Sequence, residues 1–357
     1  GFQRKPDPSA IAIQQLLAGK PAIKIIVREE GWYRVTQPEL VAGGLSSKVN
    51  PRYLQLFVEG KEQPLRLVGR RDGVFGPGDA IEFYGVGLDT PSTDTRVYWL
   101  IEGTQPGKRI GDHVFNPSFR NPHSLPVRQA GAIRNSFASF PYTVEKKDRV
   151  IYLPAIKNGE EENFFGAVVY GIGAEQLLEV RHLDLAASEE ALLEVELQGG
   201  TTGSHHVKVS LNDHEVGEIA FEGQSKGLFQ VEVPQTLLLE GDNLVTLIPQ
   251  GGEMDVSLVD RIRLTYWHTY EADDNALRLT GQGGEQLSIG GFGDSGIRVF
   301  DITEPTEVIE VLGKVGSQKG GYAISFRVPE TGQRTLLALT EEKIRNPEGI
   351  IANHPSS

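Results

Sequence analysis

The sequence predicts an all-β protein of several β domains, one of them a β-sandwich, with few short helices. Its periodic segments are short, rich in β-branched and aromatic residues, and bounded by Gly, Pro, Asp or Asn, as is typical of strands joined by turns. Gly accounts for 42 and Pro for 20 of the 357 residues, while 39% of the residues are apolar. At about 150 residues per domain, this length indicates roughly two domains, each able to bury a core.

The first predicted domain covers residues 1–118 and is mostly β. We expect its strands in four short segments: 22–27, 53–58, 80–84 and 96–101. A helix is predicted over residues 9–17, ending before Gly19. A second helix has Pro38 in its first turn, where proline is favoured, and stops at Gly43 and Gly44.

Residues 119–148 are predicted to form an extended linker. This part of the chain and its borders hold Pro117, Pro122, Pro126 and Pro141, and they contain few periodic apolar runs. Proline lacks the N–H group that a sheet ladder needs, so the composition favours an extended strap.

Residues 149–271 are predicted to form a jelly-roll or galactose-binding-like β-sandwich. Strand signals recur there at short intervals, in segments 167–170, 177–183, 192–197, 206–211, 215–221, 228–233, 243–248 and 256–267. Apolar residues alternate in these segments, as at Val207, Val209 and Leu211, so each strand buries one face. Asn212 and Asp213 predict a short hairpin turn between two of the strands. This number of strands is typical of two packed sheets.

Residues 272–357 are predicted to form a small β unit that ends in a polar tail. Its expected strands are 276–280, 297–301, 308–311, 322–328 and 335–339. The chain opens on Gly1 without an initiator Met or a signal pattern, and it closes on a segment without a helix stop or a strand end. We therefore expect a piece of a longer precursor.

Charge and cysteine content exclude several classes of function. The formal net charge is −13, with +4 over residues 1–130 and −17 over 131–357, which argues against nucleic acid or anionic lipid as a partner. Cys is absent, so the chain alone has no disulfide, thiolate metal site or cysteine nucleophile. No stretch approaches the roughly 20 apolar residues that cross a bilayer, so no membrane span is expected.

The tetrapeptide Gly293-Asp294-Ser295-Gly296 is the strongest catalytic candidate, because a serine nucleophile can be held on a tight turn. Such a site also needs a general base and a group that orients it. None of the eight histidines stands in a setting that marks a base. The pattern favours an ordinary β-turn, and no catalytic residue is predicted.

His205, His206 and His214 are candidates for a metal pair, because they flank the predicted hairpin. Adjacent strand residues point to opposite faces, so only one of His205 and His206 could meet His214. Two histidines without a third ligand are not a metal site. The pattern favours solvated hairpin histidines.

Carboxylates gather in two places, namely at Asp72, Asp79 and Glu82, and at Glu271, Asp273 and Asp274. Oxygen-rich turns can hold calcium, which takes about six to eight oxygen ligands. The EF-hand spacing is absent, and the glycines beside the first group explain it as a set of turns. We predict no cofactor and no metal site, with calcium as the alternative left open.

Several rings close the last predicted strand of the sandwich: Tyr266, Trp267, His268 and Tyr270. Exposed rings on a sandwich can stack on sugars. Alternation places Trp267 on the face opposite the other three, and a tryptophan is more often core than platform. The Gly-rich segment 281–284 lacks the strand and helix context of a nucleotide site and is predicted to be a loop.

Several longer strings occur together along the chain. They are GWYRVT at 31–36, LQLF at 54–57 followed by Gly60, GDAIEFYG at 78–85, DTRVYWL at 94–100, NFFG at 163–166, LTYWHTY at 264–270 and FDIT at 300–303. As a set, they resemble the region that precedes the peptidase domain in secreted bacterial proteins of the gingipain family. The likeness covers nearly the whole chain.

The resemblance implies a secreted or surface-attached bacterial parent that is made as a precursor. In that family, a segment like residues 350–357 leads into a caspase-like domain with a His and Cys dyad, so the parent would be a cysteine-type endopeptidase. We expect this chain to stop at that junction, and no position in it inherits a catalytic role.

These observations lead to two hypotheses about function. In the first, the chain is no enzyme but a non-catalytic N-terminal accessory region that stabilises, orients or covers its own C-terminal peptidase domain. In the alternative, the sandwich at 149–271 is a carbohydrate-binding or cell-surface adhesion module with a glycan or protein ligand.

Overall fold

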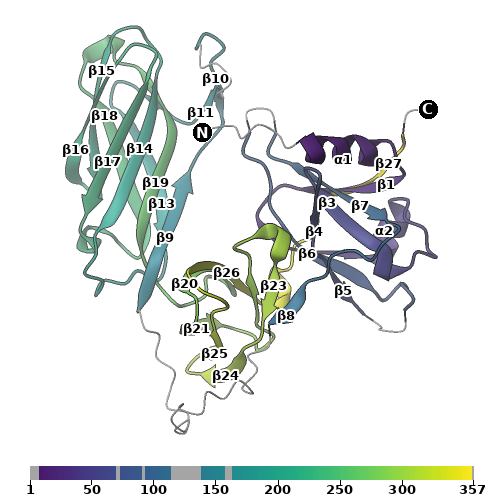
Figure 1. The fold of residues 1–357 in the computed structure, drawn as a ribbon. Coiled ribbons are helices and arrows are strands. Elements are labelled where there is room, and N and C mark those ends of the chain that lie inside the picture. Colours follow the sequence, from purple (N-terminus) through teal and green to yellow (C-terminus); the bar gives the residue numbers. More distant parts are fainter. Residues whose placement is uncertain (1–7, 70–72, 91–92, 114–137, 157–162, 356–357) are drawn as a thin grey trace. The chain divides into compact units, whose positions relative to one another are not determined.

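Antiparallel sheet dominates the structure, as the alternating sequence predicts. The computed structural model describes residues 8–69, 73–90, 93–113, 138–156 and 163–355 (Figure 1). Within these ranges two α-helices occur, and the other regular elements are strands and single 3-10 turns. The all-β prediction is confirmed. None of the helices in the described ranges has the length and apolar character needed to span a bilayer.

The chain folds as two compact units, whose bounds differ from the predicted domains. Residues 1–134 and 274–357 together form the first unit, and residues 135–273 form the second, which we call the sandwich unit. The expectation of a separate domain over 272–357 is thereby corrected, because its strands share sheets and a core with the front of the chain.

The first unit contains both α-helices. They are α1 (Pro8–Ala18) and α2 (Gln37–Ala42), and 3-10 turns cover Pro51–Tyr53, Pro305–Glu307 and Glu341–Lys343. The strands of this unit are β1 (Ala22–Val27), β2 (Gly31–Thr36), β3 (Leu54–Val58), β4 (Lys61–Gln63), β5 (Arg66–Val68), β6 (Ala80–Gly85), β7 (Arg96–Glu102), β8 (Gly111–His113), β20 (Ala276–Gln282), β21 (Gln286–Phe292), β22 (Arg298–Asp301), β23 (Ile309–Val311), β24 (Lys314–Gln318), β25 (Gly321–Arg327), β26 (Gln333–Leu339) and β27 (Gly349–Asn353).

Two sheets enclose the front core of the first unit, with strand orders β27-β1-β7-β3-β4 and β2-β6-β5. Their inner faces bury Ile25, Leu56, Phe83 and Leu100. Both predicted helices are present, and Gly43 follows the last turn of α2 as expected.

The rear of the first unit consists of two more sheets, β20-β26-β22-β23-β8 and β21-β25-β24. Strand β8 comes from the front of the chain and pairs in parallel with β23. A second core cluster joins Trp32 and Tyr84 from the front sheets to Phe300 and Leu339 from the rear. This shared burial explains why the two ends of the chain fold together.

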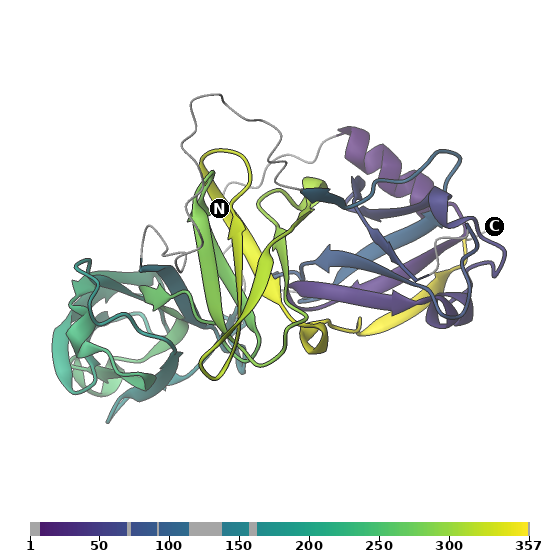
Figure 2. The same cartoon turned by 90° about the horizontal axis from the view of Figure 1, so that it is seen from below.

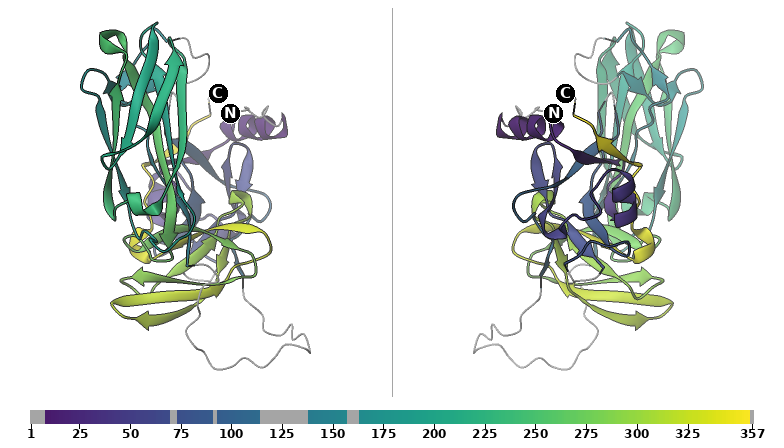
Figure 3. Two further views of the ribbon diagram at one scale, coloured as in Figure 1. Left: turned by 90° about the vertical axis from the view of Figure 1, so that its left-hand side faces the viewer. Right: turned by 90° about the vertical axis from the view of Figure 1, so that its right-hand side faces the viewer.

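Strand β27 corrects the expectation of a polar tail. It pairs antiparallel with β1, and Ile350 packs against the front core. The side-chain amide of Asn353 donates to the carbonyl groups of Ala18 at 3.0 Å and Lys20 at 2.7 Å. These bonds tie the end of β27 to the end of α1, and the two elements lie side by side in Figures 1 and 3.

The sandwich unit consists of two antiparallel sheets and a small hairpin. Its strands are β9 (Ser139–Lys146), β10 (Ile151–Tyr152), β11 (Phe164–Phe165), β12 (Val168–Val169), β13 (Ala174–Val180), β14 (Ala191–Gly199), β15 (Ser204–Leu211), β16 (His214–Glu222), β17 (Lys226–Val233), β18 (Gly241–Pro249) and β19 (Ser257–Thr269), with 3-10 turns at Gln235–Leu237 and Gly252–Met254. One sheet has the order β12-β19-β14-β17, with β9 also paired to β19, and the other has the order β13-β18-β15-β16.

The inner faces of these two sheets bury the alternating apolar residues that predicted the sandwich. Val195, Val207, Val209 and Leu247 are among the fully buried members of this core. Figure 2 looks nearly along the strands of the unit, with the two layers on either side of the core.

The predicted linker over 119–148 is corrected at its C-terminal end. Residues Ser139–Lys146 form β9, which pairs antiparallel with β19 along its whole length, and Phe140 is buried. Pro141 is tolerated because β9 lies at the margin of the sheet. Residues 119–137 lie outside the described residues.

The predicted hairpin at Asn212 and Asp213 is confirmed. These residues connect β15 to β16 and have φ angles of 48° and 65°. Positive φ at both central residues is the signature of a type I′ turn, whose twist matches that of antiparallel strands. The Asn212 amide also donates to the Leu237 carbonyl at 2.8 Å, which fixes the turn against the 3-10 turn at Gln235–Leu237.

Candidate functional site

Ser295 lies on an exposed turn between β21 and β22. Residues 293–296 are all exposed. The Gly293 N–H donates to Asn275 Oδ1, and the Gly296 N–H donates to Asp294 Oδ1, each at 2.6 Å. Among the described residues, no histidine hydrogen-bonds to Ser295. The tetrapeptide therefore has the geometry of an ordinary turn.

The Gly-rich segment 281–284 is the end of a strand followed by a turn that leads into another sheet. Gly281 and Gln282 belong to β20, and the turn to β21 follows them. Gly284 has a φ of 84°, and its N–H donates to the Val328 carbonyl at 2.9 Å. The predicted loop is present but begins two residues later than expected.

His205 is buried, which corrects the expectation of a solvated side chain. Its Nδ1 lies 3.0 Å from Asp255 Oδ1, and its Nε2 lies 3.0 Å from the Gly223 carbonyl oxygen. The ring stacks on Phe221 with 4.6 Å between centroids. Both nitrogens thus face acceptors, and the side chain holds together the loops that join β16 to β17 and β18 to β19.

His206 and His214 are exposed, and the structure does not bring them together. His206 Nε2 lies 2.6 Å from Glu218 Oε2, and His214 Nδ1 lies 2.8 Å from the Asn212 carbonyl oxygen. The described ranges contain no group of three or more His, Asp or Glu side chains placed to hold a metal ion.

The first group of carboxylates is divided between a turn and a buried cluster. Asp72 lies outside the described residues. Asp79 is buried, and its Oδ2 accepts the Gly76 N–H at 2.6 Å, as the turn interpretation predicts. Glu82 is fully buried and is paired with arginine, so its oxygens are already occupied.

The second group of carboxylates meets histidines. Asp273 Oδ2 lies 3.2 Å from His268 Nε2, and Asp273 Oδ1 lies 3.5 Å from His182 Nε2. His182 has a φ of 49°, a rare conformation for a non-glycine residue. Glu271 is partly exposed and Asp274 is exposed.

The aromatic end of β19 shows the predicted alternation, but with the faces exchanged. Tyr266, His268 and Tyr270 are buried, whereas Trp267 is partly exposed. The Tyr266 hydroxyl donates to the Arg181 carbonyl at 2.9 Å, and burial raises the pKa of this phenol. The core position expected for Trp267 is therefore taken by its neighbours.

Sequence analysis missed a buried charged site in the first unit, which we call the Glu82 cluster: Glu82, Arg34, Arg298, Trp32 and Phe300. Glu82 Oε2 accepts hydrogen bonds from Arg298 Nη1 at 2.8 Å and Trp32 Nε1 at 3.1 Å, and Oε1 accepts one from Arg34 Nε at 2.9 Å. The rings of Trp32 and Phe300 stack, and the Arg298 guanidinium lies 4.8 Å from the Phe300 centroid.

The environment of Glu82 keeps the carboxylate charged. Burial by itself raises its pKa, but the charge of Arg298 and the hydrogen bonds from Arg298, Trp32 and Arg34 outweigh burial and hold the pKa below its ordinary value. Because Arg298 comes from β22 and Glu82 from β6, the cluster joins the rear of the first unit to its front.

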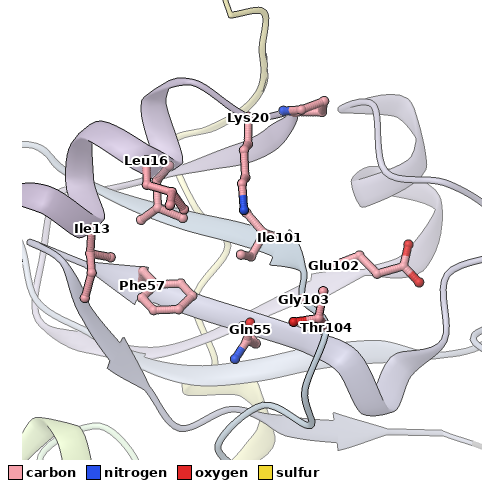
Figure 4. A pocket seen from close by; sticks show the side chains of 11 residues that line it. Ile13, Leu16, Lys20, Gln55, Phe57, Ile101, Glu102, Gly103 and Thr104 are labelled. Atoms are coloured by element: carbon pink, nitrogen blue, oxygen red, sulfur yellow. The ribbon is translucent and has the colours of Figure 1, made fainter.

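A groove lies between α1 and the outer face of strands β3 and β7, and sequence analysis missed it too. Its volume is about 510 Å³. Ile13 and Leu16 reach it from α1, and Phe57 and Ile101 line it from the sheet (Figure 4). The Lys20 side chain also points into it (Figure 4). The signal that could have found this groove is the absence of charge from the sequence of α1.

The acidic charge of the chain is concentrated in the sandwich unit. Residues 135–273 contain nine Lys and Arg against 24 Asp and Glu, a formal net charge of −15. The first unit has 26 against 24, or +2. The sandwich surface therefore repels anionic polymers at moderate ionic strength.

No family model and no curated protein sequence matches this chain. Among solved structures, dimeric latent PorU from Porphyromonas gingivalis matches 95% of it at 14% identity with a TM-score of 0.65. The chain spans about a third of that protein, 34% of its length.

Smaller likenesses involve carbohydrate-binding modules. One is CBM36 in complex with calcium and xylotriose, at 13% identity over 34% of this chain and 98% of that one, with a TM-score of 0.24. Another is CBM35 from Cellvibrio japonicus Abf62, at 12% identity over 35% of this chain and 91% of that one, with a TM-score of 0.23. These low TM-scores decide nothing about the present chain. What the comparisons show is a fold shared with PorU over nearly the whole chain.

Proposed function

We propose that this chain is a non-catalytic accessory region of a longer, secreted bacterial cysteine peptidase of the gingipain kind, and that it stabilises or orients the peptidase domain. The observation that carries the proposal is the fold shared with PorU, which extends over 95% of this chain and a third of that one. The strings that resemble the region before a gingipain-type peptidase domain point the same way. No cofactor is part of the proposal.

The polar groups at the centre of each unit also support a structural role. Glu82 and His205 are both buried, and each is hydrogen-bonded to a side chain at least 50 residues away in the sequence. A group whose oxygens or nitrogens are all occupied by structural bonds holds a fold together. Such an arrangement is consistent with a structural role for these residues.

The test is to express the longer precursor with and without residues 1–357 and to measure the yield of soluble protein and its peptidase activity. We expect the shortened precursor to lose most of its soluble, active peptidase, because the peptidase domain loses its support. Equal yield and equal activity from the two forms would contradict the proposal.

A second candidate function is glycan binding by the sandwich unit. Trp267 favours it, because this ring is partly exposed on the outer face of β19, where it could stack on a sugar. The charge of −15 on this unit disfavours anionic glycans.

On a glycan array, residues 1–357 should then bind neutral glycans and lose this binding in the variant Trp267→Ala. The matched control is Trp99→Ala, which removes a partly exposed tryptophan from the first unit and should leave binding unchanged. No binding above background, or equal binding by both variants, would remove this candidate.

A further inference from the structure

Helix α1 exposes no charged side chain, and its exposed polar side chains are Ser9, Gln14 and Gln15. Its eleven residues, PSAIAIQQLLA, contain no charged side chain, although 23% of the residues of the chain are charged. It buries Ala10 and Leu17 against the unit, yet Ile13 and Leu16, which line the groove beside it, are exposed. Large apolar side chains that gather on an exposed surface often mark an interaction site.

The apolar surface continues from α1 onto the neighbouring sheet. Trp99 pairs with Phe57 on one side and with Lys24 on the other, and Lys24 pairs with Ile351 of β27, so their side chains share the outer face. The Lys24 ammonium lies 4.8 Å from the centroid of the Trp99 ring, which leaves its alkyl stem over the apolar face. Ile351 is 52% exposed.

We call this surface the α1 face: Ile13, Leu16, Phe57, Trp99, Ile101 and Ile351, with the groove of about 510 Å³ inside it. Lys20 and Glu102 also line the groove, so charged side chains accompany the apolar ones. The other large apolar side chains exposed in the described part of the first unit, Ile11, Leu67, Val74 and Leu312, lie outside this face as defined.

The C-terminal end of strand β27 lies next to the end of α1. This strand is an edge strand of the sheet, and the Asn353 amide ties its end to the carbonyl groups of Ala18 and Lys20, where α1 ends. PorU, which shares the fold, is about three times as long as the stretch matched. A domain joined to β27 by a short connection would be held near α1 at an effective concentration in the millimolar range.

We propose that the α1 face is the docking surface for the peptidase domain that follows this chain in its precursor. This inference rests on the proposed function and assigns the contact through which the accessory region supports its partner. Because the chain would be covalently connected to the peptidase domain, docking is intramolecular and needs no high intrinsic affinity. An apolar face of modest size is therefore sufficient for docking. Ile13 and Leu16 of α1 and the groove beside them become the buried centre of the contact.

The absence of cysteine from residues 1–357 provides the test. A single reporter is introduced by Leu16→Cys, at a side chain that is 52% exposed, and its rate of alkylation is measured in residues 1–357 alone and in the precursor. The cysteines of the precursor's peptidase domain are replaced by alanine for this purpose. The matched control is Leu312→Cys, the same substitution at a leucine of the same unit that is 48% exposed.

In the isolated chain both reporters should react fast, with an unchanged circular-dichroism melting curve. In the precursor, the Leu16→Cys reporter should react slower by about tenfold or more, the factor that corresponds to docking favoured by ~1.4 kcal/mol. The Leu312→Cys reporter should keep its rate.

Equal rates for Leu16→Cys in chain and precursor, or equal slowing of both reporters, would overturn the assignment of the α1 face. If removal of residues 1–357 still abolished peptidase activity, the accessory role would stand and only the docking surface would be wrong. If removal had no effect, the proposed function and this inference would fall together.

Discussion

Replacing Glu82 by glutamine is expected to destabilise the first unit by about 3–5 kcal/mol, because it removes the fully buried negative charge that both Arg34 and Arg298 contact. Glu82 is fully buried, and both of its oxygens are occupied by Arg34, Arg298 and Trp32. The unfolding free energy is measured by denaturant titration. The fluorescence of Trp32 reports on the site, because its indole donates to Glu82 directly.

The matched control is Glu341→Gln. Glu341 also pairs with Arg34, but its side chain is 63% exposed, so water and salt screen the pair. We expect a loss of at most about 1 kcal/mol for this variant. If the two variants lost the same stability, burial would not be what makes the Glu82 cluster strong.

Acidification is expected to lower the stability that the Glu82 cluster contributes. The pKa of Glu82 is held below its ordinary value, so the carboxylate contributes stability that is fully present above the unfolded pKa of about 4.3. That contribution is lost as the pH falls below about 4.3 and through the lowered pKa of the folded state. The Glu82→Gln variant should therefore show a shallower loss of stability on acidification than the parent chain does.

The second large effect is expected at His205. The variant His205→Phe keeps a ring of similar size, so it leaves no large cavity, but it removes both hydrogen bonds. Asp255 Oδ1, which is buried, and the Gly223 carbonyl oxygen then each lose the ring nitrogen that faces them, and we expect a cost of about 1–3 kcal/mol per oxygen to the sandwich unit.

His206→Phe is the control for this substitution. It removes the adjacent histidine, whose side chain is about half exposed and pairs with Glu218 at the surface. Its cost should stay below about 1 kcal/mol. Hydrogen exchange of the amides in β15 measures both effects within the sandwich unit, and equal losses in the two variants would show that the buried pair adds nothing.

Local patterns predicted the strands and turns well. The alternation of Val207, Val209 and Leu211 and the turn at Asn212 were enough to place β15 and β16, because a strand with one buried face has a period of two. His205 lies two residues before Val207, so the same alternation places its side chain on the buried face of the strand. The burial of His205 could therefore have been predicted from the alternation of the strand. The expectation of a solvated histidine was wrong because it followed the polarity of the residue instead of its position in the alternating pattern.

The contacts that join the two ends of the chain into the first unit could not be predicted from local sequence patterns. Glu82 meets Arg298 across 216 residues of sequence, and Asn353 meets Ala18 across 335. No local composition specifies which distant arginine will reach a buried carboxylate. For the same reason the segment that became β27 looked like a polar tail, since its strand character depends on pairing with β1.

The accessory role itself is tested most directly by adding purified residues 1–357 back to a precursor that lacks them. The account predicts that the shortened precursor has little peptidase activity alone and regains it when the chain is added at about the millimolar effective concentration of the tethered domain, whereas the chain alone has none. Activity that is the same with and without the added chain, at the level of the complete precursor, would contradict the account.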